Sequence, residues 1–191
     1  MYPLYILSGG KSSRFGSDKA LARLHGRPLL LHVHELFKKY SSETLILSGD
    51  KDNYPTLPFP CLPDITPHQG PLGGLVTALH HHATKAPTWF FLVSCDLAGI
   101  QHTWIEQLLQ HTDANTHAIV YRDQHHWEPL FALYHTSIAP LVQQQLDNGQ
   151  RAMWKLLEAA NTTALPKPAD WHKATQINHP DDLLAHIHKG S

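Results

Sequence analysis

Short apolar runs alternate with segments of helical period along the chain, and this pattern predicts an α/β fold. The predicted strands are residues 4–7, 44–47, 61–62, 89–94, 118–121 and 129–134, and the run 129–134 is taken as the last clear strand. The predicted helices are residues 29–40, 70–84, 103–111, 137–146 and 151–160. A strand, a helix and a strand in this order imply a parallel, right-handed crossover unit. The run 89–94 is the most hydrophobic and reads as a central strand buried on both faces.

Length and charge describe an ordinary globular chain. Its 191 residues are enough for a substantial core, and we expect residues 1–191 to form a single domain. The formal net charge is −1, so no overall field draws nucleic acid or an anionic membrane to the protein. No apolar run approaches the roughly 20 residues that cross a bilayer. We therefore expect neither a nucleic-acid nor a membrane partner, and an anion must bind at a local site.

Cysteine usage and the start of the chain favour a cytoplasmic protein. Cys61 and Cys95 lie far apart without a CxxC spacing, so neither a zinc site nor a disulfide framework is expected. The first predicted strand begins at residue 4, which leaves no room for the charged and apolar regions of a signal peptide.

The 17 histidines are the unusual feature of the composition. We interpret them as solvated surface positions, which would give a mild pH dependence of surface charge between roughly pH 6 and 7. The runs 80–82 and 125–126 are the consecutive ones. Consecutive side chains on a helix point around it rather than toward one ion, and this disfavours a histidine metal site.

The candidate chemistry begins in residues 5–21, YILSGGKSSRFGSDKAL. A buried strand is followed by a loop with three glycines, four serines and three cations. Glycines let the main chain approach a ligand closely, and consecutive peptide N–H groups form an anion-binding concavity. Arg14 and Lys19 add full positive charges. The loop is therefore predicted to bind a polyphosphate; the alternative is a surface loop that is basic by chance.

A second glycine-rich segment, GPLGGL at residues 70–75, opens the predicted helix 70–84. Glycines at a helix start leave backbone N–H groups exposed to a ligand. A plain turn and close packing of the helix on the sheet are the two structural alternatives. The short strand 61–62 precedes this segment and delivers Asp64 to its end.

Asp96 directly follows the most hydrophobic strand. A carboxylate in that position lies at the carboxyl edge of the sheet, where open α/β folds bind ligands. Mg²⁺ takes hard oxygen ligands and usually needs only one or two carboxylates together with substrate phosphates. The alternative is an N-cap of the next helix, although Thr103 is better placed for that role. Cys95 is interpreted as a buried packing residue.

Four motifs resemble, in order, those of the nucleotidyltransferase family that includes molybdenum cofactor guanylyltransferase. LSGGKSSRFGSDKA resembles L-A-G-G-x-S-x-R-M-G-x-D-K, with Ser8 and Phe15 as departures, and GPLGG matches the family's base-contacting G-P-L-x-G. CDLA resembles C-D-x-P, with Ala98 in place of proline. QINHPDDL resembles N-x-N-x-P-x-D-L, with Gln176 in place of asparagine. The resemblance covers nearly the whole chain.

The resemblance implies a three-layer α/β/α, Rossmann-like nucleotidyltransferase fold with a mostly parallel, mixed central sheet. It implies a Mg²⁺-dependent reaction in which GTP donates GMP to molybdopterin or the molybdenum cofactor. The products would be the guanine dinucleotide cofactor and pyrophosphate. Molybdoenzymes or cofactor-delivery proteins are implied as further partners. The segments 7–10 and 71–74 resemble the GTP-using relatives rather than those that use CTP.

The resemblance and the motifs together assign the nucleotide site. Arg14, Lys19 and Asp96 are the predicted catalytic residues, with both cations on the β and γ phosphates, where charge builds on the leaving group. The predicted nucleotide-binding residues are Leu7, Ser8, Gly9, Gly10, Arg14, Lys19, Ser48, Asp64, Pro71, Gly73, Gly74 and Asp96. Asp64 would accept hydrogen bonds from guanine or ribose. An acceptor phosphate is already deprotonated near pH 7, so no general base is required.

The predicted metal ligands are Asp96 and Asn178. Mg²⁺ held there would bridge the α-phosphate and the leaving oxygen as Lewis acid and template. A structural alternative exists for the closing motif, because Asp181 and Asp182 would lie in the first turn of a further helix at the end of the chain and favour its dipole.

The acceptor is expected beside Trp127, Glu128 and Pro129, and Arg151 matches a recurrent basic position of the family. Two alternatives stay open. One is a related nucleotidyltransferase that uses CTP or a sugar-phosphate acceptor, which comparing GTP with CTP binding would separate. The other is a non-catalytic nucleotide-binding protein, against which the intact cations and carboxylate of the site argue.

Overall fold

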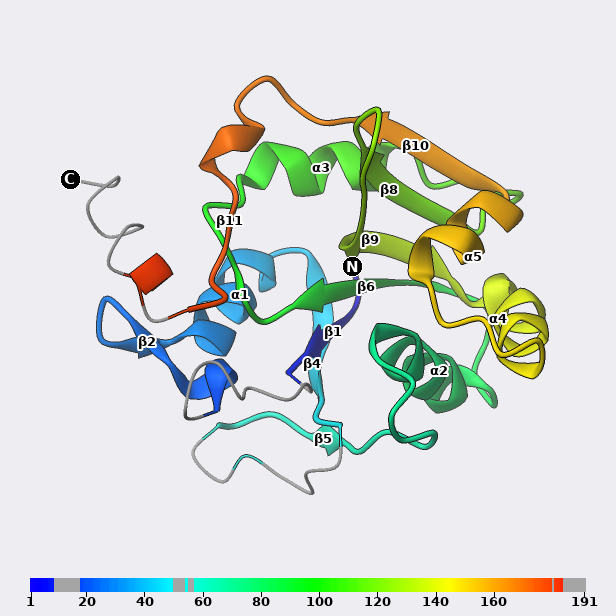
Figure 1. The fold of residues 1–191 in the computed structure, drawn as a ribbon, viewed down its shortest axis with the longest axis horizontal. Coiled ribbons are helices and arrows are strands. Elements are labelled where there is room, and N and C mark those ends of the chain that lie inside the picture. Colours follow the sequence, from blue (N-terminus) through cyan, green and yellow to red (C-terminus); the bar gives the residue numbers. More distant parts are fainter. Residues whose placement is uncertain (9–17, 50–53, 55–56, 180, 184–191) are drawn as a thin grey trace.

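The computed structural model describes residues 1–8, 18–49, 54, 57–179 and 181–183. Its centre is a seven-stranded sheet in the order β10-β8-β9-β6-β1-β4-β5 (Figure 1). The strands are β1 (Tyr2–Leu7), β4 (Ser41–Leu47), β5 (Cys61–Leu62), β6 (Trp89–Ser94), β8 (Ala118–Arg122), β9 (Trp127–His135) and β10 (Thr162–Pro166). Strand β9 runs antiparallel to β6 and β8, and the pairings without β9 are parallel. The sheet is therefore mixed and mostly parallel, as predicted.

Helices cover both faces of this sheet (Figure 1). Helices α1 (Leu29–Phe37) and α3 (His102–Gln110) pack on one face, and α2 (Pro71–His82), α4 (Ala139–Asp147) and α5 (Met153–Ala159) pack on the other. Strand β1 shows why both faces are apolar: Leu4 and Ile6 join the core of α1 and α3, whereas Tyr5 and Leu7 join the core of α2. Successive strand side chains point to opposite faces. The predicted three-layer α/β/α fold is confirmed.

Smaller elements complete the fold. Strands β2 (Arg23–Leu24) and β3 (Arg27–Pro28) form a hairpin, and β7 (Leu97–Ala98) pairs antiparallel with β11 (Thr175–Gln176). The 3₁₀ helices are η1 (Lys19–Leu21), η2 (Thr136–Ile138) and η3 (Trp171–Lys173). The pairing of β7 with β11 brings the segment after residue 174 alongside the end of β6 (Figure 1).

Strand β10 was not predicted, because 129–134 was taken as the last clear strand. Leu165 is the buried residue of β10, and the other positions are half-buried or exposed. The strand lies at the edge of the sheet, so it needs no two-sided apolar run. Its sequence therefore carries little of the periodicity by which strands are predicted.

The helix boundaries differ from the predictions by a few residues. The helix predicted over 29–40 ends at Phe37, and the one predicted over 137–146 begins at Ala139 because η2 precedes it. Helix α3 has Gln101 at its N-cap position without a side-chain cap. The expectation that Thr103 caps α3 is wrong, because Thr103 lies inside the helix.

Within the residues described, no helix is both long and apolar enough to pass through a lipid bilayer.

Candidate functional site

The carboxyl ends of β1, β4 and β6 meet at one edge of the sheet. In the parallel ladders Leu7 pairs with both Leu47 and Ser94. The next residues continue this alignment, because Ser8 N donates to Leu47 O at 3.0 Å and Cys95 N donates to Leu7 O at 2.9 Å. Asp96 therefore follows β6 at the edge where β1 leads into the glycine-rich loop, as parallel strands require.

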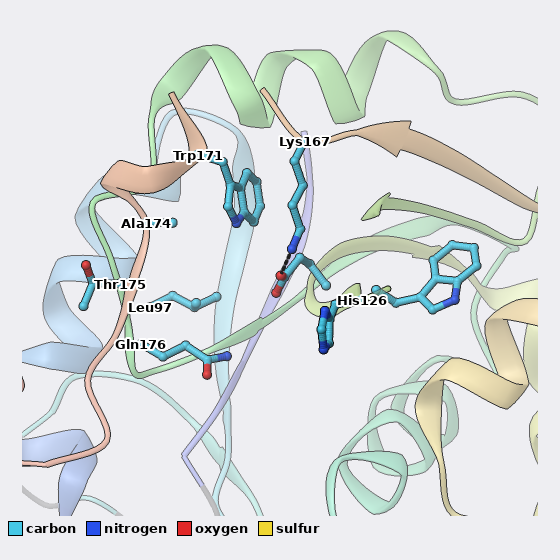
Figure 2. A pocket seen from close by; sticks show the side chains of 9 residues that line it. Leu97, His126, Lys167, Trp171, Ala174, Thr175 and Gln176 are labelled. Carbon is cyan, nitrogen blue, oxygen red and sulfur yellow. Dashed lines mark ion pairs between the residues drawn. The ribbon is translucent and has the colours of Figure 1, made fainter. Parts of the chain in front are cut away.

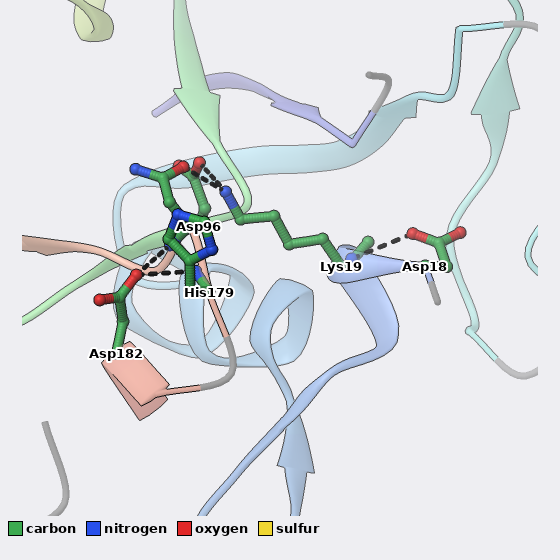
Figure 3. A network of polar contacts seen from close by, with 7 residues as sticks. Asp18, Lys19, Asp96, His179 and Asp182 are labelled. Carbon is green, nitrogen blue, oxygen red and sulfur yellow. Dashed lines mark hydrogen bonds and ion pairs between the residues drawn. The ribbon is translucent and has the colours of Figure 1, made fainter. Parts of the chain in front are cut away.

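Lys19 and Asp96 are in direct contact at this edge (Figure 3). The Lys19 Nζ donates to Asp96 Oδ2 at 2.6 Å and to Asn178 Oδ1 at 2.8 Å. Both charged side chains are mostly buried, with exposed fractions of 17% for Lys19 and 15% for Asp96. The backbone of Lys19 is fixed by η1, at whose N-cap Asp18 accepts a hydrogen bond from Ala20 N. Asp96 and Asn178, which lie far from Lys19 in sequence, thus converge on its ammonium group.

Asn178 reaches this point through the β7–β11 ladder. Gln176 pairs with Leu97, and Ile177 N donates to Asp96 O at 2.9 Å. Asp182 Oδ2 accepts from the backbone N–H groups of Asn178 and His179, at 2.7 Å each. These hydrogen bonds lower the pKa of Asp182. Besides any effect on a helix dipole, Asp182 therefore holds the loop that carries Asn178.

The oxygen atoms around Lys19 suit a hard divalent cation. Asp96 Oδ1 is buried and has no hydrogen-bond partner among the residues described. Asp96 Oδ2 and Asn178 Oδ1 already face one positive charge, the Lys19 ammonium. The described residues contain no group of three or more His, Cys, Asp or Glu side chains that could cage a metal. Few protein ligands at a phosphate site is the usual arrangement for Mg²⁺, so the residues fit that ion.

Gly74 and Gly73 are explained first by packing. A Cβ on Gly74 would overlap Leu7 Cδ2 and come within 3.4 Å of Leu47 Cδ1, so the glycine lets α2 lie directly on β1 and β4. A Cβ on Gly73 would lie 3.1 Å from Thr66 O and 3.5 Å from Asp64 Oδ2. The backbone N–H of Gly73 donates to Gly70 O at 3.0 Å. Close packing of helix on sheet, one of the two structural alternatives, therefore holds for Gly74.

The other nucleotide-site residues named from the sequence lie near this edge with different degrees of access. Ser8 is buried, and its Oγ donates to Leu47 O at 3.2 Å and accepts from Tyr54 Oη at 3.0 Å. Leu7 and Ser48 are also buried. Asp64 is half-buried, and its N–H donates to Gly49 O at 2.6 Å.

Pro71 is the N1 residue of α2. It lines the larger of the two cavities described below.

Three of the predicted residues, Gly9, Gly10 and Arg14, lie outside the described residues. Their roles stay predictions.

A cavity of about 730 Å³, here called the larger cavity, lies beside the β8–β9 hairpin. Its lining residues are Pro71, Arg122, His125, His126, Trp127, Pro129, Leu130, Arg151, Ala152, Met153, Trp154 and Glu158. Arg122 lies over the Trp127 ring, 4.4 Å from its centroid, and Arg151 Nε donates to Gln69 Oε1 at 2.6 Å. The indole Nε1 of Trp127 is buried and finds no hydrogen-bond partner within the described part of the chain. The cavity thus combines apolar walls with two guanidinium groups.

A second cavity of about 410 Å³, the smaller cavity, is drawn in Figure 2 and shares His126 and Trp127 with the first. Lys167 Nζ contacts Glu128 Oε1 at 2.6 Å and Asp123 Oδ2 at 2.8 Å. Trp171, Leu97 and Gln176 also line this cavity. Among the described residues, Lys19 and Asp96 line neither cavity. The lining of the smaller cavity does include Leu97, the neighbour of Asp96 in sequence, and Gln176, which precedes Asn178 by two positions.

Sequence reasoning named Trp127, Glu128, Pro129 and Arg151 but missed other residues that line these cavities. The missed ones include Met153, Trp154, Lys167 and Trp171. Arg122 begins the segment 122–128, which the sequence indicates to be a polar turn at a functional edge. Lys167 and Trp171 follow β10, the strand that gave no apolar pattern, so no sequence signal pointed to them.

Cys95 is a packing residue. It is buried in the core between the sheet and α1. Burial, with a smaller contribution from the adjacent Asp96 charge, raises the pKa of its thiol to about 12. The thiol therefore stays protonated near neutral pH and is no nucleophile.

One of the histidines contradicts the expectation of solvated positions. His82 is only 4% exposed, and its Nε2 lies 2.9 Å from Tyr5 Oη. The same hydroxyl lies 2.5 Å from His81 Nδ1. His82 also stacks on Phe90. Burial lowers the pKa of both histidines, which makes them neutral partners of a buried tyrosine.

Comparison with known proteins places the chain in a family by its sequence. A family model described as "MobA-like NTP transferase domain" matches residues 4–164. A Deinococcus radiodurans protein named "Probable molybdenum cofactor guanylyltransferase" is 35% identical over 179 residues, covering 93% of this chain and 90% of that protein.

Two solved structures share the fold. Molybdopterin-guanine dinucleotide biosynthesis protein A from Archaeoglobus fulgidus has a TM-score of 0.80 at 22% identity, covering 99% of this chain and 100% of that one. The 2-C-methyl-D-erythritol 4-phosphate cytidylyltransferase from Thermus thermophilus has a TM-score of 0.70 at 14% identity, covering 98% of both chains. One architecture is therefore shared by proteins named for different nucleotides, and the fold alone does not select the base.

Proposed function

The chain belongs to the MobA-like NTP transferase family and is a nucleotidyltransferase; from this premise we propose that it transfers GMP from GTP to molybdopterin or the molybdenum cofactor. The products are pyrophosphate and the guanine dinucleotide form of the cofactor. The observation that carries this proposal is the position of Lys19 Nζ between Asp96 Oδ2 and Asn178 Oδ1, at the carboxyl edge of the sheet. A cation and hard oxygen ligands then meet where this type of fold binds its ligand.

The residues of this edge do most of their work by position and charge. Transfer requires an anionic acceptor to approach the α-phosphorus in line with the departing pyrophosphate, and repulsion between anions is the obstacle. Lys19 would supply a positive charge for the leaving phosphates, and Arg14 is proposed as its partner. Asp96 and Asn178 would hold Mg²⁺, which supplies Lewis-acid stabilisation of phosphate oxygens when bound. The acceptor phosphate needs no general base, because it is ionised near pH 7.

The larger cavity suits the acceptor. Molybdopterin combines a planar heterocycle with a phosphate, and the cavity offers Trp127 and Trp154 together with the cations Arg122 and Arg151. Guanidinium groups bind phosphate oxygens with two parallel hydrogen bonds. The buried Nε1 of Trp127 makes no hydrogen bond among the described residues, so a polar atom of the acceptor would satisfy it. The smaller cavity shares His126 and Trp127 with it and is lined by Leu97, the residue after Asp96.

The proposal of guanine as the base rests on Asp64. Its carboxylate lies beside the start of α2, with Oδ2 3.5 Å from the position of a Cβ on Gly73. Guanine presents N1–H and N2–H₂ as adjacent donors, which one carboxylate accepts together. Cytosine has no such pair of donors, so Asp64 favours GTP over CTP. The competing function is cytidylyl transfer, which the shared fold of the Thermus thermophilus cytidylyltransferase keeps open.

The test is an assay of pyrophosphate release with Mg²⁺ and molybdopterin or its molybdenum form, comparing GTP with CTP at equal concentrations. Mass spectrometry of the product identifies the transferred nucleotide. We expect turnover with GTP and at least about tenfold less with CTP, the scale of one lost charged hydrogen-bond pair. Asp64→Asn should reduce this preference. Transfer of CMP rather than GMP, or no transfer from either nucleotide, would refute the proposed function.

A further inference from the structure

Lys19 occupies the place where a metal ion would be expected. Its ammonium is held by Asp96 Oδ2 at 2.6 Å and by Asn178 Oδ1 at 2.8 Å. These are the two side chains proposed above as metal ligands. Figure 3 shows the extended lysine side chain reaching from η1 to Asp96, and the same ammonium donates to Asn178 Oδ1. The lysine ammonium therefore already occupies the oxygen atoms that a divalent cation would need as ligands.

We propose that Lys19 competes with the divalent cation for Asp96 and Asn178, so that the metal is admitted only together with the nucleotide. This inference rests on the proposed metal site and adds a binding order to it. Without nucleotide, the lysine closes the site to free Mg²⁺. With nucleotide, the lysine moves to the phosphates and releases both oxygen ligands.

The nucleotide-free state leaves too few oxygen atoms for an ion. Asp96 Oδ1 is the remaining oxygen of the pair without a hydrogen bond among the described residues, and it is buried. Mg²⁺ gives up its water reluctantly and wants near-octahedral oxygen coordination, which one carboxylate oxygen does not provide. The lysine charge at 2.6 Å from the same carboxylate also repels a divalent cation. The lysine thus excludes the metal ion in two ways: it occupies the oxygen ligands, and its positive charge repels the ion.

The triphosphate can reverse this state. Lysine is a compact charge on a flexible four-carbon stem, so its ammonium can change partners while its Cα stays on η1. Phosphate oxygens offer it stronger and more numerous acceptors than one carboxylate and one amide. Once Lys19 turns to them, Asp96 and Asn178 face the metal that the same phosphates bring. Nucleotide and metal then bind with positive coupling, and the coupling is reciprocal.

The test measures metal binding rather than activity. Mn²⁺ replaces Mg²⁺, and free Mn²⁺ is followed by electron paramagnetic resonance while full-length protein is titrated without nucleotide. Lys19→Met keeps the length of the side chain but removes the charge, and Lys19→Gln is a second neutral replacement. Lys38→Met is the matched control, because Lys38 pairs with Glu35 at the surface, with 61% of its side chain exposed. Circular dichroism confirms that each variant is folded.

We expect both Lys19 variants to bind Mn²⁺ at least about tenfold more tightly than the wild type, and Lys38→Met to match the wild type. Adding Asp96→Asn to Lys19→Met should abolish the gain. With a non-transferable GTP analogue, the wild type should gain at least about tenfold in Mn²⁺ affinity, and Lys19→Met should gain less. Equal Mn²⁺ affinities of wild type and Lys19 variants without nucleotide would overturn the inference.

The outcome is separate from that of the proposed function. Failure of GMP transfer would appear in the pyrophosphate assay and leave the Mn²⁺ comparison intact. Failure of the competition would appear in the Mn²⁺ comparison, with transfer still measurable.

Discussion

The two halves of the proposed site are built in different ways. In the nucleotide half, Asp96 follows the central strand β6 by two residues and Lys19 begins η1, the next described element after β1, and their ammonium and carboxylate meet at 2.6 Å. In the acceptor half, the lining residues come from the β8–β9 hairpin, α5 and the segment after β10. The nucleotide half lies at the ends of buried parallel strands. The acceptor half is formed by side chains from several elements that line the two cavities. The proposed catalytic charges therefore lie beside the buried strands, and the proposed acceptor recognition lies on the part that a family can vary.

We expect the largest effect on activity when a charge is removed from the nucleotide half. Lys19→Ala and Asp96→Ala should each lower kcat by at least about 100-fold, the scale of a lost preorganised electrostatic contact. Pyrophosphate release with GTP, Mg²⁺ and the acceptor measures the effect, and Lys38→Ala serves as the control. Turnover close to wild type in either variant would show that the contact has no catalytic role.

A smaller effect is expected from the cation of the acceptor half. Arg151→Ala should raise the acceptor KM by about 10-fold to 100-fold, as for a hydrogen bond to a charged group, and leave the GTP KM unchanged. Steady-state kinetics with each substrate varied in turn measures both constants.

Gln69→Ala is the matched variant, because Gln69 accepts from Arg151 Nε at 2.6 Å. If Arg151 acts only by holding the start of α2, both variants will raise the GTP KM instead. That result would assign Arg151 to the nucleotide half.

The unpaired indole N–H gives a finer test. Trp127→Phe keeps an aromatic ring in the wall of both cavities but removes the buried Nε1, which has no partner among the described residues. We expect the acceptor KM to rise about threefold to tenfold, the size of one neutral hydrogen bond, with the GTP KM constant. An unchanged or lower acceptor KM would mean that this N–H does not meet the acceptor.

The smallest effect concerns pH and stability. Burial lowers the pKa of His82, so below about pH 6.5 the unfolded chain takes up a proton before the folded chain does. The free energy of unfolding should therefore fall as pH decreases from 7 to 5, until the folded-state pKa is passed. Urea denaturation across this range measures the slope, and His82→Phe should flatten it. Equal slopes in the two proteins would remove His82 as the cause.

In the acceptor half, the contribution of Asp123 to stability should change over a lower pH range than that of His82. The pKa of Asp123 is held below its ordinary value by its hydrogen bond from Lys167 and by two backbone N–H donors. The unfolded carboxylate is protonated first as pH falls below about 3.9. The stability that Asp123 contributes is thus present above that pH and is lost only under strong acid. Comparing how the free energy of unfolding of Asp123→Asn and of His82→Phe changes with pH would separate the two pH ranges.

Much of the fold was predictable because its central strands are apolar on both faces. The runs that became β1, β4 and β6 are short, continuous and followed by polar residues, which also located Asp96 at the sheet edge. The prediction failed for β10, where Leu165 is the buried position and the edge location removes the need for an apolar face. Periodicity detects burial, so it misses a strand that is barely buried.

The site was predictable to the extent that its residues lie next to those strands. Lys19 and Asp96 were named from their positions after β1 and β6, and the structure places them in contact. Lys167 and Trp171 were not named, because they reach the smaller cavity through tertiary contacts that have no local pattern. His82 was misjudged for a related reason: its burial depends on Tyr5 and Phe90, which lie far away in the sequence.

The most direct test of the central claim is a crystal structure with Mn²⁺ and a non-transferable GTP analogue, in which anomalous scattering locates the metal. We predict Mn²⁺ in contact with Asp96 and a phosphate oxygen, with the Lys19 ammonium on the β or γ phosphate. A triphosphate bound elsewhere, or Lys19 still paired with Asp96 beside an occupied nucleotide site, would contradict the account.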